Sequence, residues 1–323
     1  MKVTATLAPT IDNGQKTAKN EKPFVSVVVP AYNESAIIEK NLGVLCEYME
    51  SLSNKFRWEL IVVNDGSTDQ TGDLAEAFAR DKKNVHVLHH MYNFRLGQAL
   101  RFAFSKCRGE YVVVIDADLS YSPDHIGKML TKIRETRAKI VIASPYMKGG
   151  KVSNVPWLRK MFSIWANRFL SLTAARDSFS DKLRTLTGMV RAYDGKFLSK
   201  LNLKAMDVDI MPEIIYKAMI LRARIVEVPA HLNWSSHKDD GKRRKSSMRI
   251  FKSIISSFLS GFTFRPFMFF IVPGLGLAIL SLYPITWAII HTVVSFKNLP
   301  TSGQFVDAGF SAAVIYDVSN NCA

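Results

Sequence analysis

Short apolar runs alternate with longer amphipathic stretches over the first two thirds of the chain. The runs are rich in β-branched residues and predict strands, whereas the stretches between them repeat apolar residues every three to four positions and predict helices. Strands are expected at residues 26–30, 58–63, 85–88, 111–115, 140–143, 186–190 and 224–228, and helices at about 34–52, 68–80, 97–107, 123–134, 157–172 and 211–221. Strands and helices that alternate in this way form right-handed βαβ units. The predicted fold class is therefore α/β, with a doubly wound, mostly parallel sheet.

The pattern changes after residue 236. Residues 237–245 form a basic loop, and apolar residues in 246–260 recur at helical spacing, which predicts an amphipathic helix at a bilayer surface. Residues 266–290 contain no charged side chain, and a helix of about 25 residues is long enough to cross a hydrocarbon core of ~30 Å. One transmembrane helix is therefore expected. Because the basic flank precedes it, the positive-inside rule places the N-terminal domain in the cytoplasm.

These changes divide the chain into five predicted regions. The first 22 residues are polar, lack the apolar core of a signal peptide, and are expected to be disordered. The others are a catalytic domain at 23–236, a basic loop with an interfacial amphipathic helix at 237–264, a transmembrane helix at 265–292 and a C-terminal tail at 293–323. An apolar run in that tail is interrupted by Asp307 and Asp317, so the tail resembles a truncated second membrane segment.

Charge narrows the class of partner. Lys and Arg outnumber Asp and Glu by 43 to 28, which gives a formal net charge of +15 and favours an anionic partner: nucleic acid, a phosphorylated substrate or an anionic membrane surface. The chain has no zinc-finger spacing and no aromatic-basic recognition pattern, so no nucleic-acid partner is expected. Its three cysteines are far apart, which indicates neither a disulfide framework nor a zinc site and fits a reducing compartment.

Candidate chemistry gathers where the predicted strands end. The strand at 111–115 is followed by Asp116 and Asp118, and ligands bind at the carboxyl ends of the strands in sheets of this kind. Carboxylate oxygens suit Mg²⁺ or Mn²⁺ held against a diphosphate, although Asp is also common in simple turns. Residues 30–34 and 64–67 bring further polar groups to the same edge. The absence of a Gly-x-Gly-x-x-Gly or Walker loop argues against dinucleotide or ATP binding.

Together these motifs resemble the family-two glycosyltransferases with a GT-A fold. More narrowly, the chain is similar to the polyprenyl-phosphate glycosyltransferases, a group that includes dolichol-phosphate mannose synthase and GtrB-like enzymes. The similarity extends from about Val25 to Ile290. It implies Mg²⁺ or Mn²⁺ as cofactor, with a nucleotide sugar, a polyprenyl phosphate lipid and a membrane as partners.

The resemblance also implies a role for individual residues. The nucleotide pocket would be lined by Pro30, Tyr32, Glu34 and Asp65, with Asp65 on the base. Asp116 would contact the ribose or the metal, and Asp118 would ligate the metal directly; both count as catalytic. The family often has Gln two residues beyond the second Asp, where this chain has Ser120. Water would then replace the third protein ligand.

The acceptor side is implied in the same way. Arg159 and Ser163, four residues apart on one face of the predicted helix, match the pair that grips the acceptor phosphate, and Arg159 is counted as catalytic. Besides Ser120, the chain departs from the family pattern at Arg95, where a Gly is usual, at Pro145, which stands in place of an Arg, and by one extra residue before Arg191. On spacing alone, Arg159 and Ser163 could equally be an exposed charge and a small packing residue.

The predicted function is inverting transfer of one hexose, from UDP-glucose or GDP-mannose, to a polyprenyl phosphate. The reaction would take place at the cytoplasmic face of the cell inner membrane or an equivalent membrane. Two alternatives are a membrane glycosyltransferase with a glycan or glycolipid hydroxyl as acceptor, and a non-catalytic membrane-anchored nucleotide-sugar binder. The donor base and sugar, the lipid length and a homo-oligomeric state are left open.

Overall fold

The computed structural model describes residues 22–155, 157, 161, 183–233 and 266–297. The chain divides into two units, one ending at Pro266 and the other beginning at Phe267, and each is described by itself. The main sheet of the first unit comprises β1 (Phe24–Ala31), β2 (Arg57–Asn64), β3 (Val85–His89), β4 (Tyr111–Val114), β5 (Ile140–Ser144), β7 (Arg191–Asp194) and β8 (Ile225–Pro229). Its helices are α1 (Ile38–Ser51), α2 (Thr71–Ala79), α3 (Arg95–Lys106), α4 (Asp124–Thr136), α6 (Gly195–Ser199) and α7 (Ile210–Ile220). A second, two-stranded sheet pairs β6 (Lys151–Ser153) with β9 (His231–Asn233).

The main sheet is mostly parallel and doubly wound, as predicted. Its strand order is β3-β2-β1-β4-β7-β5-β8, and β7 runs antiparallel to both of its neighbours. The chain builds outward from β1 through β2 to β3 and then returns to place β4 on the other side of β1. The carboxyl ends of β1 and β4 therefore form a topological switch point, which is where open α/β sheets bind ligands.

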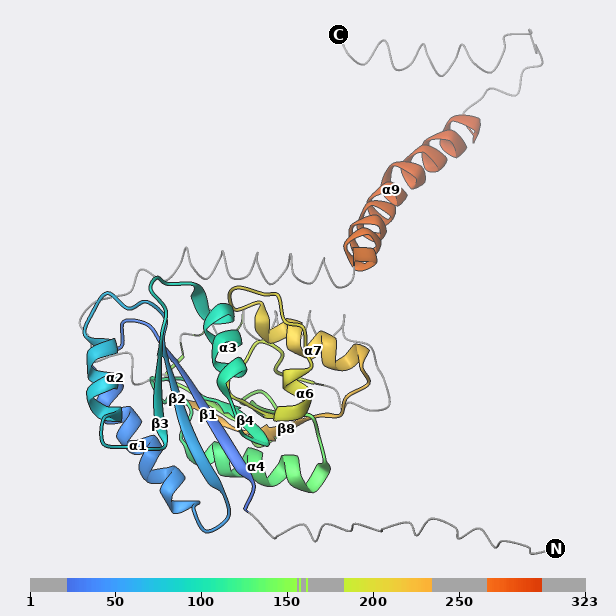
Figure 1. Ribbon diagram of the computed structural model, residues 1–323. Coiled ribbons are helices and arrows are strands. Elements are labelled where there is room, and N and C mark those ends of the chain that lie inside the picture. Colours follow the sequence, from blue (N-terminus) through green and yellow to red (C-terminus); the bar gives the residue numbers. More distant parts are fainter. Residues whose placement is uncertain (1–21, 156, 158–160, 162–182, 234–265, 298–323) are drawn as a thin grey trace, which may run out of the picture. The chain divides into compact units, whose positions relative to one another are not determined.

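Helices cover both faces of this sheet (Figure 1). One core joins the sheet to α1, α2 and α4, and it includes Ile38, Leu45, Met129 and Ile133. The other joins the sheet to α3, α6 and α7. Central strands enclosed in this way must be apolar on both faces, which explains the continuous Val-rich runs of β1 and β4.

The prediction of a strand at residues 186–190 is wrong. The structure starts β7 at Arg191 and runs it antiparallel between β4 and β5. The preceding residues are held by side chains instead: Glu227 Oε1 accepts the backbone N–H groups of Arg184 and Thr185, at 3.0 and 2.7 Å. The predicted helix 157–172 lies outside the described residues apart from Trp157 and Met161, as do the lead-in and the basic segment before the membrane helix.

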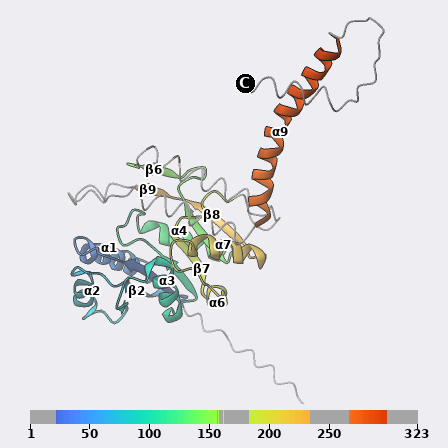
Figure 2. The same cartoon turned by 90° about the horizontal axis from the view of Figure 1, so that it is seen from above.

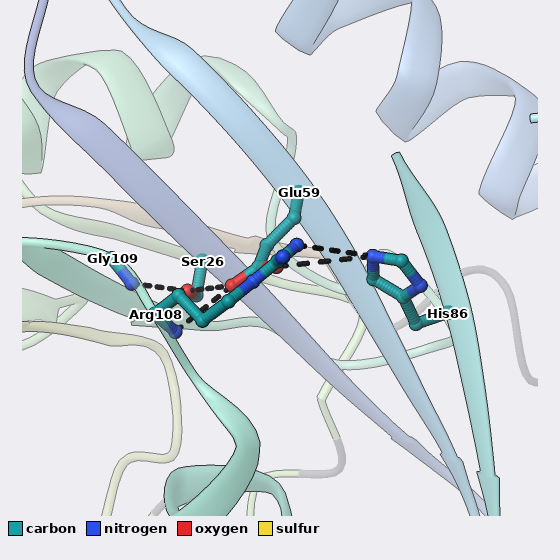
Figure 3. Close-up of polar contacts among 5 residues, drawn as sticks. All are labelled: Ser26, Glu59, His86, Arg108 and Gly109. Atoms are coloured by element: carbon teal, nitrogen blue, oxygen red, sulfur yellow. Dashed lines mark hydrogen bonds and ion pairs between the residues drawn. The ribbon is translucent and has the colours of Figure 1, made fainter. Parts of the chain in front are cut away.

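A buried polar cluster ties together the amino ends of three strands (Figure 3). Glu59 on β2 is 1% exposed, and its carboxylate accepts the Ser26 hydroxyl at 2.5 Å and the Arg108 Nε and Nη2 at 2.8 and 2.5 Å. Gly109 N–H donates in turn to the Ser26 hydroxyl at 2.8 Å. These residues lie at the opposite end of the strands from the switch point, so we assign them to stability.

Replacing Arg108 by Ala is expected to destabilise the fold by about 1–3 kcal/mol, because the buried Glu59 carboxylate loses its charge-assisted partners. Denaturant unfolding of the detergent-solubilised chain measures this change. Lys128→Ala is the matched control, since Lys128 bridges Asp124 in the open, with both side chains about half exposed. Its expected effect is below about 0.5 kcal/mol. Equal, small effects of the two variants would contradict the assignment.

The second unit contains α9 (Pro266–Lys297). Within it, residues 273–294 form the one helix in the described part of the chain that is long and apolar enough to cross a membrane. Its large apolar side chains are exposed, which is costly in water and natural in lipid. The hydroxyls of Ser281, Thr286 and Thr292 each donate to a carbonyl within the helix, as a hydrocarbon environment requires.

Candidate active site

The two aspartates lie in a tight turn directly after β4. Leu119 adopts a left-handed backbone (φ 50°), and its N–H donates to the Asp116 carbonyl at 3.2 Å. The Asp118 carboxylate accepts the Ser120 N–H at 2.8 Å, which fixes the side chain against its own loop. Asn41 Nδ2 on α1 donates to the carbonyl between the two aspartates at 2.8 Å. Backbone and helix together therefore hold both carboxylates at the switch point.

Negative charge is concentrated there. Burial raises the pKa of the Asp116 carboxyl to about 7, and the nearby carboxylates of Asp118 and Glu34 contribute to this shift. A site that keeps like charges this close suits a divalent cation, which favours the ionised forms. No group of three or more His, Cys, Asp or Glu side chains among the described residues is arranged to hold a metal. The carboxylates of Asp116 and Asp118 are hard oxygen ligands of the kind that Mg²⁺ and Mn²⁺ prefer, and water or a diphosphate would supply the other ligands.

The loops after β1 and β2 are bonded to each other, and this fixes Glu34. Asn33 (φ 56°) donates from its N–H to the Ser67 hydroxyl at 3.0 Å, and its side-chain oxygen accepts the Thr68 N–H at 2.9 Å. Glu34 N–H donates to the Thr71 hydroxyl at 2.8 Å. Next to them, Tyr32 leaves 39% of its surface exposed. The predicted nucleotide-lining residues Tyr32 and Glu34 therefore lie in the loop after β1, at the edge of the site, with the Tyr32 ring accessible.

Asp65 lies at the end of the adjacent strand and is 4% exposed. Its Oδ1 accepts the Phe94 N–H at 3.0 Å and lies 2.7 Å from His90 Nδ1. The His90 ring stacks on Phe102 at 5.1 Å between centroids. These contacts make His90 the partner that orients Asp65, and no local motif signals them.

Two residues near Asp65 have a backbone conformation with positive φ, which favours glycine. Gly66 has a φ of 64°, and a Cβ at this position would lie 2.2 Å from the carbonyl carbon of Tyr92, so only glycine fits. Arg95, which stands where the family usually has Gly, also has a positive φ of 72°. The chain thus keeps the conformation that the family's glycine favours, and Arg95 Nη1 contacts Asp207 at 3.1 Å.

Ser120, at the position of the family's Gln, is 6% exposed and lies where the turn joins β9. Its carbonyl accepts the Asn233 N–H at 2.9 Å, and the next residue, Tyr121, forms an antiparallel bridge with Leu232. Burial raises the pKa of the Tyr121 hydroxyl, and the nearby Asp116 carboxylate adds to this shift. The Tyr121 hydroxyl therefore lies close enough to the Asp116 carboxylate to interact with its charge, although no sequence motif identifies Tyr121.

Arg191 is fully buried rather than presented to a phosphate. Its Nη1 and Nη2 donate to the carbonyls of Met211 and Leu186, at 2.9 and 2.5 Å. Among the described residues, its Nε and the Tyr193 hydroxyl are buried without a hydrogen-bond partner. Arg191 thus joins the chain before β7 to the first turn of α7. The predicted acceptor residues Arg159 and Ser163 lie outside the described residues.

Comparison with known proteins agrees with this geometry. The sequence profile of Glycosyl transferase family 2 matches residues 26–201. The polyprenol monophosphomannose synthase of Mycolicibacterium smegmatis is 32% identical over 210 residues, which cover 63% of this chain and 75% of that protein. A dolichyl-phosphate beta-glucosyltransferase of Trichomonas vaginalis is 30% identical over 156 residues, 46% of this chain and 48% of its own length.

The fold also has relatives among solved structures. Glucosyl-3-phosphoglycerate synthase from Mycobacterium tuberculosis, solved with Mn²⁺, UDP and phosphoglyceric acid, superposes with a TM-score of 0.54. The superposition covers 74% of this chain and 78% of that one, at 18% identity, and shows a shared fold.

The family match, together with the mostly parallel sheet and its acidic turn at the switch point, identifies the protein as a glycosyltransferase with a GT-A fold. The chain belongs to glycosyl transferase family 2. Its similarity to polyprenyl-phosphate glycosyltransferases, expected from the sequence motifs, is confirmed by these relatives.

Proposed function

We propose that this chain transfers one hexose from a nucleotide sugar to a polyprenyl phosphate, with inversion at the anomeric carbon. The observation that carries the proposal is the pair Asp116 and Asp118, held at the switch point of a family-two sheet beside Glu34. Relatives named for transfer to polyprenol and dolichyl phosphate support the acceptor class. Because one relative is a mannose enzyme and the other a glucose enzyme, GDP-mannose and UDP-glucose both stand as donors.

Each residue has a distinct part in this scheme. Asp65, oriented by His90, would hold the base, and the exposed Tyr32 would lie against the nucleoside. Asp116 and Asp118 would hold Mg²⁺ or Mn²⁺, which when bound supplies Lewis-acid neutralisation of the leaving diphosphate. The acceptor phosphate is already anionic near neutral pH and needs little help from a general base. Positioning and charge stabilisation would therefore supply most of the catalysis.

The membrane helix suits a lipid acceptor. A polyprenyl phosphate keeps its hydrocarbon tail in the bilayer, so an enzyme that uses it must act at the membrane surface. The helix at residues 273–294 is long enough to anchor this protein there. We propose that the catalytic domain is cytoplasmic, since the basic segment precedes this helix.

A transfer assay tests the proposal. The detergent-solubilised chain is incubated with Mn²⁺, a polyprenyl phosphate and either radiolabelled GDP-mannose or radiolabelled UDP-glucose, and the products are extracted into organic solvent. Label in a lipid product supports the proposal and identifies the donor. Label in a glycan would favour a hydroxyl acceptor instead, and nucleotide binding with no turnover across donors would favour a non-catalytic binder.

Arg159→Ala is expected to raise the KM for polyprenyl phosphate about tenfold or more, because a charge-assisted bond to phosphate is worth about 1.5–3 kcal/mol. The KM for the nucleotide sugar should not change. Lys160→Ala is the matched control, since it removes a neighbouring positive charge that the motif does not include. If both variants raise the acceptor KM equally, the effect comes from general charge rather than from a specific contact.

A further inference from the structure

His125 occupies the first turn of α4 and is 3% exposed. Its Nδ1 lies 2.8 Å from the Ser122 carbonyl oxygen, and its Nε2 accepts the His231 backbone N–H at 3.1 Å. A carbonyl can only accept, so Nδ1 carries the proton and Nε2 presents its lone pair. The ring therefore uses both nitrogens to join the start of α4 to β9, across 106 positions of sequence.

Two further contacts in the described part of the chain attach β9 to the turn after Asp118. They are the bond from Asn233 N–H to the Ser120 carbonyl, at 2.9 Å, and the antiparallel bridge between Tyr121 and Leu232. On its far side β9 pairs with β6, and Figure 2 shows the two strands side by side. The turn that carries Asp118 is therefore bonded to the small sheet that β9 forms with β6.

Two side chains from the carboxyl end of β6 bind side chains of β9. The Ser153 hydroxyl on β6 lies 2.8 Å from Nε2 of His231, and Asn154 Nδ2 donates to the Asn233 side-chain oxygen at 2.9 Å. The aromatic ring of Tyr121 packs edge-on against His125, with centroids 6.0 Å apart. His125 thus contacts both the turn and the strand that supports it, through a ring that is almost completely buried.

We infer that His125 is a positioning residue for cation binding by the turn, an inference that rests on the proposed function. Without the imidazole, the His231 N–H loses its acceptor, whereas the Ser122 carbonyl keeps the His125 backbone N–H, so β9 is released from the start of α4. The turn that presents Asp118 then loses part of its support. Loss of a contact that supports metal-binding residues commonly lowers the affinity for the ion about 10- to 100-fold.

The test compares His125→Leu, which fills the buried position with an apolar side chain and removes donor and acceptor, with His125→Gln, whose amide offers both. Mn²⁺ binding to the detergent-solubilised full chain is measured by calorimetry with a nucleoside diphosphate present, and kcat and KM are measured alongside. His125→Leu is expected to weaken Mn²⁺ binding about tenfold and to lower kcat, and His125→Gln to recover most of both.

Ile133→Ala serves as the control for stability, since it creates a cavity on the same helix two turns further along. It should lower the unfolding temperature and leave Mn²⁺ affinity unchanged. Equal Mn²⁺ affinity in the His125→Leu variant and the parent would overturn the inference. A parent chain that binds Mn²⁺ but transfers no hexose overturns the proposed function, and the Mn²⁺ affinities still decide the role of His125. A parent chain that binds no Mn²⁺ overturns both.

Discussion

Replacing Asp118 by Asn is expected to lower the hexose transfer rate by about 100- to 1000-fold, the size of effect seen when one preorganised electrostatic contact to a transition state is removed. Asn keeps the shape of the side chain and can still accept the Ser120 N–H, so the turn should persist. What it loses is the charge that would hold the cation against the departing diphosphate. The measurement is kcat/KM with saturating Mn²⁺.

A second measurement separates lost chemistry from lost structure. Mn²⁺ with a nucleoside diphosphate should raise the unfolding temperature of the parent chain, since a ligand that binds only the folded state stabilises it, and should leave the Asp118→Asn variant unchanged. Asp73→Asn, on an exposed position of α2, is the control and should behave like the parent in both measurements. Full activity in Asp118→Asn would show that the metal assignment is wrong.

Replacing Asp116 by Asn is expected to stabilise the metal-free chain at alkaline pH while abolishing transfer. The pKa of the Asp116 carboxyl is raised from 3.8 to about 7 by burial and by two neighbouring carboxylates. Between these values the folded state holds a proton that the unfolded chain has released, so the stability of the parent falls as pH rises through this window. The full shift is worth on the order of 4 kcal/mol.

Thermal unfolding in EDTA at several pH values measures this effect. The parent and Asp116→Asn should unfold at similar temperatures below about pH 4, and the variant should unfold at the higher temperature above about pH 7. Adding Mn²⁺ with a nucleoside diphosphate at pH 8 should stabilise the parent alone. A gap that is the same at every pH would mean that Asp116 does not titrate in this range.

Much of the sheet could be predicted because a parallel strand that is buried on both faces has a continuous run of apolar residues in the sequence. The runs at 26–30, 58–63 and 111–115 correspond to β1, β2 and β4. The segment at 186–190 misled for the same reason, since it is apolar and β-branched in part. In the structure its first carbonyl, that of Leu186, accepts a hydrogen bond from the Arg191 side chain, and the residue before it, Thr185, donates its N–H to Glu227. Those partners are side chains that no local pattern identifies.

Prediction of the site shows the same division. The order of the motifs along the chain predicts that Glu34, Asp116 and Asp118 lie close together, because strand ends at a switch point must converge. The partners that hold these groups could not be predicted in this way. His90 stands 25 positions from Asp65, and His125 stands 106 positions from His231.

The sequence by itself determined the α/β class, the apolar helix and the position of the acidic turn, since each depends on periodicity or on residues adjacent in the chain. Only the tertiary structure decided that β7 enters the sheet in the opposite direction, that Arg191 is enclosed, and that β9 supports the turn of Asp118. The physical reason is that these features come from contacts between distant segments, whose free energy depends on burial and on hydrogen-bond partners that exist only once the chain has folded.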